Sequence, residues 1–333
     1  MKIKKIALVT ISILLLTTGC GNKTYLKEDK NIVTFEETGQ SLQNNILCKP
    51  REQKLYEVYE KYNDQLSIKL EDLPSCETFK PSDIKYKSLW ESIFVKPLAY
   101  IILKLGLLIK NFGVSVMLIG IGIRLILLPF SKKTMDQSEN MKKAAPEIQK
   151  IEKKYANRTD SDAMMIKSQE TMLIYKKYKI NPVSGCLLAF IQLPLFFAFL
   201  QAINRVPAIF EDSLLGMKLG MTPWVGISQG KYIYILLIIL IVGTTYFSFK
   251  NSMKNQNVNS AIESQMRFTL IFMIVMISIA SFSLPTAIAL YWVVTNGFVV
   301  LQNFIFKKIN EKKTDLIKPV KSKDKKENKK RGK

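Results

Sequence analysis

A single arginine, Arg124, stands inside the apolar run GIGIRLILLPFSKK, Gly120 to Lys133. A guanidinium does not lose its proton in a protein, and at the centre of a membrane helix it costs roughly 2.5–3.5 kcal/mol on insertion scales. Because Arg124 precedes Lys132 by about 12 Å of helix, extension of its side chain to the membrane surface is one explanation. The alternative is a water-filled cavity inside a helix bundle, since six apolar residues follow Arg124 and no Asp or Glu lies inside any apolar stretch to pair with it. Such a cavity would attract the acidic, hydrophilic part of another chain.

Other polar side chains interrupt the apolar stretches and are candidates to line the same cavity. They are Gln192, Thr244, Thr245, Thr295 and Asn296, with Tyr291 and Trp292 beside them. Each has a simpler explanation as well, because Thr, Asn and Gln also form hydrogen bonds between membrane helices. Tyr and Trp likewise favour the membrane interface.

The rest of the composition excludes several kinds of catalyst. The 333 residues contain no histidine, which excludes imidazole acid–base catalysis and histidine metal ligation. The four cysteines show no CxxC pairing, and the chain has no GxGxxG, P-loop or GxSxG motif. We therefore expect no cofactor, no metal and no enzymatic activity. The net charge of +22 predicts anionic partners such as lipid head groups or ribosomal RNA.

These side chains must be positioned by helices that cross a membrane. A hydrocarbon layer of roughly 30 Å needs about 20 apolar residues in a helix, and five stretches approach or reach that length. They are 112–131, 183–203, 232–249, 268–284 and 287–306. The segment 90–110 differs, because Lys96, Lys104 and Lys110 fall on one face of its helix. This pattern predicts a helix on the membrane surface with its charged face in water. An extra span, the alternative, would bury Lys104.

Basic residues in the loops predict the orientation of the chain. Segment 132–182 carries 12 Lys and Arg residues, 250–267 carries three and 307–333 carries 13, whereas 205–230 carries two. The first three segments are therefore expected in the cytoplasm, and the N-terminal region outside.

Segment 132–182 is expected to form a cytoplasmic helical hairpin. Residues 135–155 and 161–179 both have the pattern of charged helices, and a turn separates them. A thin apolar seam would join the two helices. We expect it to contain Ile148, Ile151 and Tyr155 on one side and Met165, Met172 and Tyr175 on the other.

The N-terminus has the pattern of an export signal. Three lysines precede the apolar run 6–16, and small residues then lead to Cys20. Residues 1–19 are predicted to be a cleaved signal peptide. The residues before Cys20 resemble the lipobox of bacterial lipoproteins, in which the cysteine thiol is joined to diacylglycerol. The alternative is an uncleaved signal anchor with an incidental cysteine.

Residues 20–89 are polar and are predicted to lie outside the membrane. They form either a small ectodomain or a partly ordered spacer, with a short helix within 54–66. Cys48 and Cys76 lie in a compartment that permits oxidation, so a disulfide between them is possible, although spacing alone does not decide whether they meet.

Four stretches of the chain resemble the YidC membrane-protein insertase family, which includes the mitochondrial oxidase-assembly insertases. They read IRLILLPFSKK, APEIQKIEKKY, YKKYKINPVSGCLLAFIQLPLFFAFLQAI and LPTAIALYWVVTNGFVVLQN. They cover the core from about residue 90 to 306 in family order. The lipoprotein signal and the five spans resemble the forms from bacteria with a single membrane. One departure is Leu188, where the family usually has proline.

The resemblance implies an all-α polytopic membrane protein whose five transmembrane helices form a hydrophilic groove containing Arg124. The groove would open to the cytoplasm and to lipid and be closed on the outside, with the surface helix and the cytoplasmic hairpin completing the fold. The implied activity is insertion of newly made membrane proteins without a nucleotide, alone or with the Sec translocon.

The basic tail 307–333 is low in complexity and is predicted to be disordered. It would bind the ribosome or anionic lipid, or serve only to set the topology. Two rival functions remain. A secondary transporter would show an internal repeat and an intramembrane acid or histidine. A receptor-like lipoprotein would place its function in 21–89, whereas an insertase should keep its activity when that region is deleted.

Overall fold

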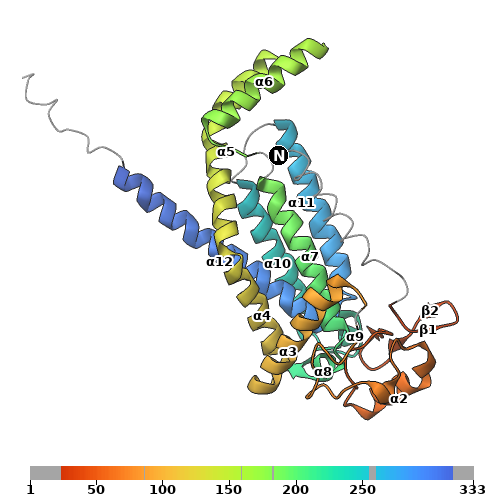
Figure 1. Ribbon diagram of the computed structural model, residues 1–333. Helices are drawn as coiled ribbons and strands as arrows, with labels where there is room; N and C mark the ends of the chain where they lie inside the picture. Colours follow the sequence, from red (N-terminus) through yellow and green to blue (C-terminus); the bar gives the residue numbers. More distant parts are fainter. Residues whose placement is uncertain (1–23, 86, 159, 182–183, 255–259, 318–333) are drawn as a thin grey trace, which may run out of the picture.

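The computed structural model describes residues 24–85, 87–158, 160–181, 184–254 and 260–317. It is mostly helical, as the sequence predicts, and its few strands form short antiparallel pairs. A helix bundle forms the centre of the molecule (Figure 1). The N-terminal region packs on one end of the bundle, which we call the capped end, and helices α5 and α6 project from the other, which we call the hairpin end.

The N-terminal region is a folded unit of two small hairpins and one helix. Its elements are β1 (Lys27–Glu28), β2 (Asn31–Ile32), β3 (Thr34–Phe35), β4 (Gln40–Ser41), α2 (Gln53–Lys61), η1 (Asn63–Gln65) and η2 (Leu70–Asp72). Helix α2 confirms the helix predicted within 54–66, and it buries Leu55 and Tyr59, which share one face four residues apart. Cys48 and Cys76 form a disulfide with their Cα atoms 4.9 Å apart. The region is therefore an ordered ectodomain-like unit and not a spacer.

The N-terminal region and the helix bundle share one hydrophobic core. A single cluster of buried side chains runs from Leu42 and Phe79 to Phe112, Phe210 and Tyr291. The segment between α7 and α10 contributes to this core through α8 (Pro207–Glu211), β5 (Ser213–Leu214), β6 (Met217–Lys218) and α9 (Pro223–Ser228). Removing residues 21–89 would therefore expose apolar surface on the bundle. This finding argues against our expectation that the core tolerates the deletion.

The remaining helices form the bundle and the hairpin. They are η3 (Glu91–Val95), α3 (Lys96–Ile109), α4 (Phe112–Ile126), α5 (Leu128–Lys154), α6 (Ser161–Lys177), α7 (Ser184–Asn204), α10 (Ile233–Lys254), α11 (Ser260–Ser281) and α12 (Thr286–Ile317). Helix α12 lies beside both α10 and α4, and α11 lies beside α10 (Figure 1).

Several of these helices are long and apolar enough to cross a membrane. Among the described residues they are Glu91–Ile109, Ile233–Lys250 and Thr286–Ile309, and α4 with α5 makes a fourth if the bent pair is one span. Parts of α7 and α11 lie outside the residues whose side chains are described, so the count of five spans stays a prediction.

The stretch 112–131 is not the single straight helix that we expected. It bends by 56° between α4 and α5, with the break at Leu127. Pro129 follows in the first turn of α5. Proline has no N–H to donate to the carbonyl four residues earlier, and its ring collides with that carbonyl. The bend therefore begins three residues after Arg124.

Helix α3 departs from its predicted charged face at one position. Lys96 is only 3% exposed, and its ammonium group donates hydrogen bonds to the carbonyls of Ile84 (2.8 Å) and Lys85 (3.0 Å). The prediction that Lys96 faces water is wrong because the N-terminal region covers that part of the helix. Lys104 and Lys110 are exposed. The position of α3 on the membrane surface stays a prediction.

Helices α5 and α6 pack against each other over a thin apolar seam. Ile148, Ile151 and Tyr155 take part as expected, but Met165 and Met172 are 57% and 53% exposed. These two methionines lie on the opposite face of α6, so their predicted role is wrong. Ala163 and Ile174, eleven residues apart and therefore three turns along one face, take their place.

Helix α12 extends further than the fifth predicted span. It ends at Ile317, so residues 307–317, which we predicted to be disordered, are helical. Lys and Glu are good helix formers and allow the helix to continue beyond the apolar stretch. The rest of the tail, 318–333, lies outside the described residues.

Candidate polar site around Arg124

Arg124 lies in the last turn of α4 and is half-buried within the helix bundle. The free carbonyl groups of a last helical turn favour a cation. No carboxylate among the described residues lies within ion-pair distance of Arg124, in contrast to Arg51, Arg158 and Arg205, each of which has an acidic partner. Arg124 is thus a cation in a candidate membrane helix, without a counter-ion among the described residues.

Helix α12 faces Arg124 because α4 and α12 approach closely one turn earlier. A Cβ atom placed on Gly120 would lie 3.0 Å from Cδ2 of Tyr291 and 3.1 Å from Cγ2 of Thr295. Residues four apart share a helix face, so Arg124 belongs to the same face as Gly120. Arg124 and the Tyr291 hydroxyl are close enough to interact electrostatically.

Three of the predicted polar residues donate hydrogen bonds within their own helices. Thr295 donates to the Tyr291 carbonyl (2.7 Å) and Asn296 to the Trp292 carbonyl (3.0 Å). Thr244 donates to the Leu240 carbonyl (2.7 Å) on α10. Their side-chain oxygens keep acceptor capacity. The three residues are therefore able to accept further hydrogen bonds through these oxygens.

Thr245 and Trp292 join α10 to α12. The indole N–H of Trp292 donates to the Thr245 hydroxyl oxygen at 2.9 Å, and Thr245 is fully buried. This contact matches the simpler of our two explanations, a hydrogen bond between membrane helices.

Tyr291 and Trp292 also fasten α12 to α7. Tyr291 stacks on Phe199 with a centroid distance of 3.9 Å, and Trp292 meets Phe196 edge-on at 5.2 Å. Tyr291 is buried at 3% exposure, while Trp292 is partly exposed. Both rings therefore position helices around Arg124, since aromatic pairs of this geometry add stability beyond their buried area.

One polar residue near this site was missed in the sequence. Gln302 on α12 is 6% exposed, and its Oε1 meets no hydrogen-bond donor among the described residues. It lies seven residues after Thr295, two helical turns further toward the hairpin end on nearly the same face. The signal that could have found it is the seven-residue spacing of Thr295 and Gln302 in TNGFVVLQN, which places both on nearly one face of the helix.

Two of the predicted site residues cannot be placed. Cys20 lies outside the described residues, and the side chain of Gln192 belongs to the undescribed part of α7. The remaining candidates come from α4, α10 and α12, which the structure brings together at the centre of the bundle.

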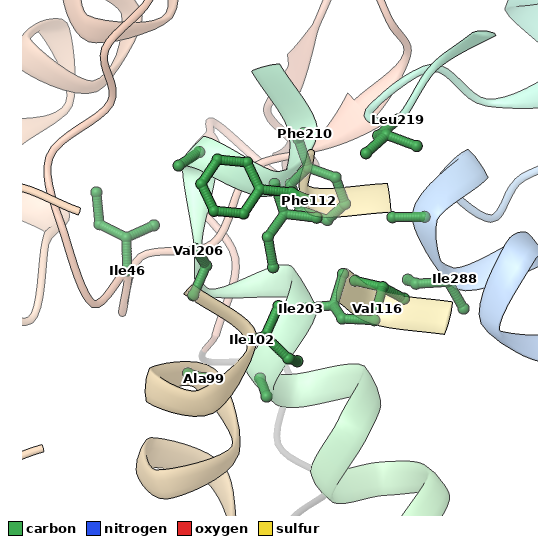
Figure 2. Packing of buried hydrophobic residues seen from close by; sticks show 14 of the residues in the cluster. Ile46, Ala99, Ile102, Phe112, Val116, Ile203, Val206, Phe210, Leu219 and Ile288 are labelled. Carbon is green, nitrogen blue, oxygen red and sulfur yellow. The ribbon is translucent and has the colours of Figure 1, made fainter. Parts of the chain in front are cut away.

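The capped end of the bundle is filled by apolar side chains. Figure 2 shows Ile46 of the N-terminal region on one side of Val206, and Phe112, Val116 and Ile288 on the other side. All five are buried. This apolar packing lies between Arg124 and the N-terminal region.

The fold defines a class: a helical membrane protein with several apolar helices, in which Arg124 has no acidic partner among the described residues. Residues 104–313 match the model of the family described as 60Kd inner membrane protein. The membrane protein insertase YidC of Oceanobacillus iheyensis is 31% identical over 239 residues, which cover 71% of this chain and 91% of that protein. YidC of Alkalihalophilus pseudofirmus is 34% identical over 243 residues, 72% of this chain and 90% of that protein. The insertase MisCA of Bacillus subtilis is 33% identical over 237 residues, 71% of this chain and 86% of that protein.

The chain belongs to the 60Kd inner membrane protein family, and the resemblance found in the sequence is thereby confirmed. The matched residues contain α4, α10, most of α12 and the whole polar site, whereas the N-terminal region lies before them.

Proposed function

We propose that this chain is a membrane protein insertase that uses the surroundings of Arg124 as a hydrophilic groove. The observation that carries the proposal is Arg124 itself: a cation on the α12-facing side of α4, without an acidic partner among the described residues. Its family relatives carry the name membrane protein insertase.

The groove works by dividing a client chain between two environments. Arg124 and the acceptor oxygens of Thr244, Thr295 and Asn296 replace part of the water around the polar, exported end of the client. The apolar part of the client moves sideways into lipid, and that transfer supplies the free energy. No nucleotide and no bond-breaking step are needed.

The groove opens toward the hairpin end and to lipid, and the hairpin end faces the cytoplasm. Support for this orientation comes from the 12 Lys and Arg residues of 132–182. The apolar packing at the capped end, which we assign to the outside, blocks an aqueous path across the membrane. The N-terminal region is exported and held at the membrane by lipid on Cys20.

The partners that we propose are newly made membrane proteins, with the Sec translocon as a companion for some of them. The basic tail binds the ribosome or anionic lipid, as the positive charge of 307–333 favours.

Reconstituted liposomes with a short, ribosome-made, single-span client test the function. Protease protection scores insertion for the native chain and for Arg124→Leu. We expect the variant to insert about 10- to 100-fold less client, since a charge-assisted hydrogen bond contributes roughly 1.5–3 kcal/mol. The matched control is Arg158→Leu, which removes an exposed arginine from the turn between α5 and α6.

Two outcomes would contradict the proposal. Equal insertion by the native chain and Arg124→Leu would favour the other explanation of Arg124, in which its side chain only extends to the membrane surface. Transport of a small solute by liposomes that insert no client would favour the secondary transporter.

A further inference from the structure

Residues 24–85, which lie before the family match, are fastened to the capped end by buried charged groups. Arg205, just after α7, is 3% exposed. Its Nη1 pairs with Oε1 of Glu91 in η3 at 2.8 Å, and its Nε donates to the Asn45 carbonyl at 2.6 Å. The carbonyl of Arg205 accepts a hydrogen bond from the Leu47 N–H at 2.8 Å. One arginine therefore joins the N-terminal region, the end of α7 and the start of the α3 helix.

A second fastening lies at the start of α2. Oε1 of Glu211 accepts hydrogen bonds from the backbone N–H groups of Arg51 (2.7 Å) and Glu52 (3.2 Å), the free donors that precede a helix. Glu211 also pairs with Nε of Arg51 at 3.1 Å, and the Arg51 guanidinium lies 5.4 Å from the centre of the Phe112 ring. Helix α2 is thus tied to α8 and to the start of α4.

A third fastening is a close backbone approach at Gly39. The Thr222 N–H donates to the Thr38 carbonyl at 2.8 Å. Gly39 has a φ of +71°, and a Cβ atom there would lie 2.6 Å from Cγ2 of Val225. Glycine is the residue that adopts this backbone conformation readily and has no Cβ atom to collide with Val225.

These contacts make the N-terminal region a rigid lid and not a tethered domain. Lifting it would leave the buried Glu211 carboxylate without its partner Arg51 and would expose the shared core. The disulfide from Cys48 to Cys76 adds to this rigidity, because it closes the loop next to the Asn45–Leu47 segment that holds Arg205.

We propose that the N-terminal region is a fixed cap that limits how long a polar segment this protein exports. This inference rests on the proposed function. The cap holds the apolar plug of Val116, Ile203 and Phe210 in place, so a polar segment in the groove has no straight exit and must leave sideways past lipid. That route becomes more costly with every polar group that loses its water, so it selects short segments. Loosening the cap loosens the plug and admits longer ones.

The first test asks whether the cap is docked or merely tethered. A protease site is placed in the exposed turn between Lys80 and Asp83, after the disulfide, in a Cys20→Ser chain that cannot carry a lipid anchor. The full-length chain is cleaved once it is folded in detergent. We expect the fragment carrying 24–80 to co-purify with the rest of the chain. Dissociation of the fragment from the otherwise native chain would overturn the proposal.

The second test uses clients that differ only in the length of their exported polar segment. The native chain is compared with Glu211→Leu, which removes the buried carboxylate that binds Arg51 and the start of α2. Glu71→Leu, which removes an exposed acidic side chain from the same N-terminal region, is the matched control. Loss of the acceptor of backbone N–H groups and of a charged partner weakens the docking of the cap, whereas an exposed side chain contributes little. We therefore expect Glu211→Leu to lose the cleaved fragment about tenfold more readily and to export a longer segment, while Glu71→Leu retains the native limit.

The outcomes separate this inference from the proposed function. If the native chain inserts even the client with the shortest segment no better than empty liposomes, the function fails. If it inserts that client but Glu211→Leu has the same length limit despite losing the fragment, only the cap fails. Loss of the shortest client in Glu211→Leu, with normal insertion by Glu71→Leu, would also overturn the limit and make the outer end a requirement for insertion.

Discussion

Gly120 of α4 lies directly against Tyr291 of α12, so closely that a Cβ atom on Gly120 would be 3.0 Å from the tyrosine ring. The contact joins two helices that are separated by about half the chain. It sets the rotation of α4 about its axis and so directs Arg124, one turn later, toward α12. The position of the cation thus depends on a residue that has no side chain.

Gly120→Leu should destabilise the bundle and impair insertion. The new side chain has no space beside Tyr291 and Thr295, and overpacking of this kind costs about 1–3 kcal/mol. Thermal unfolding in detergent measures the stability. Gly122→Leu is the matched control, since nothing lies within 4 Å of a Cβ atom at Gly122. Equal melting temperatures for the two variants would show that the close contact does not matter.

Arg124→Lys should retain part of the insertion activity that Arg124→Leu loses. Lysine keeps the positive charge but replaces the planar, five-donor fork with a compact ammonium group. The liposome assay described above gives the order native chain, Arg124→Lys, Arg124→Leu. A lysine variant as inactive as the leucine variant would mean that the shape of the guanidinium matters more than its charge.

Replacing Cys48 and Cys76 with serine should weaken the N-terminal region. The two cysteines lie 28 residues apart, and closing a loop of that size contributes about 3–4 kcal/mol in the chain-entropy description. Limited proteolysis of residues 24–85 should therefore become much faster in the double variant. The native chain treated with a strong reductant should approach the same rate, and no change in either sample would contradict the expected stabilisation.

The hairpin of α5 and α6 should loosen in acid. A hydrogen bond from Lys177 and a second from Tyr178 lower the pKa of Glu147 below its ordinary 4.5. Hydrogen bonding to Lys154 lowers the pKa of Glu170 in the same way. A lowered pKa contributes stability that is complete above pH 4.5 and is lost as the pH falls through the lower value of the folded state. The contribution is modest because both ion pairs are on the surface.

At high pH the lysines of these pairs act with the opposite sign. Glu147 raises the pKa of Lys177 above 10.5, so this contribution is present below pH 10.5 and disappears as the pH rises through the raised value.

Burial raises the pKa of Glu152, and this shift opposes the loosening in acid. A Glu152→Gln background removes that opposition. Spin labels at Lys153 and Gln169 measure the helix separation, and a separation that stays constant from pH 7 to pH 3 would contradict the prediction.

Gln302→Leu should stabilise the fold. An unsatisfied buried polar atom costs about 1–3 kcal/mol, and leucine removes Oε1 while keeping a similar volume. Chemical unfolding of the variant against the native chain measures the gain. If stability rises and insertion falls, Gln302 is kept for contact with clients. If stability falls, the side chain has a structural partner beyond the described residues.

Several elements of the fold could be read from local patterns. The amphipathic spacing of Leu55 and Tyr59 predicts α2, and Ile148, Ile151 and Tyr155 predict one side of the hairpin seam. Such patterns succeed because a helix in lipid or in water must satisfy its own backbone, and its apolar face then repeats every three to four residues.

Two of the failures concern which face of a helix another segment covers. Lys96 has the spacing of a water-facing lysine, yet carbonyls of the N-terminal region bind it. Met165 and Met172 have seam-like spacing, but the rotation of α6 against α5 selects Ala163 and Ile174 instead. Hydrophobic periodicity does not distinguish two apolar faces of one helix, since only the partner helix decides which of them is buried.

The sequence by itself determined that this is a helical membrane protein of the 60Kd inner membrane protein family. It also determined that a permanent cation, Arg124, interrupts the apolar stretch 112–131. Charge, the length of apolar stretches and the order of motifs are properties of the chain alone. The tertiary structure decided which helix Arg124 faces and that the N-terminal region belongs to the same core. Those two facts depend on contacts between residues as far apart as Gly120 and Tyr291, or Asn45 and Arg205. Such pairings are chosen by packing and burial across the whole fold, so no local stretch of sequence contains them.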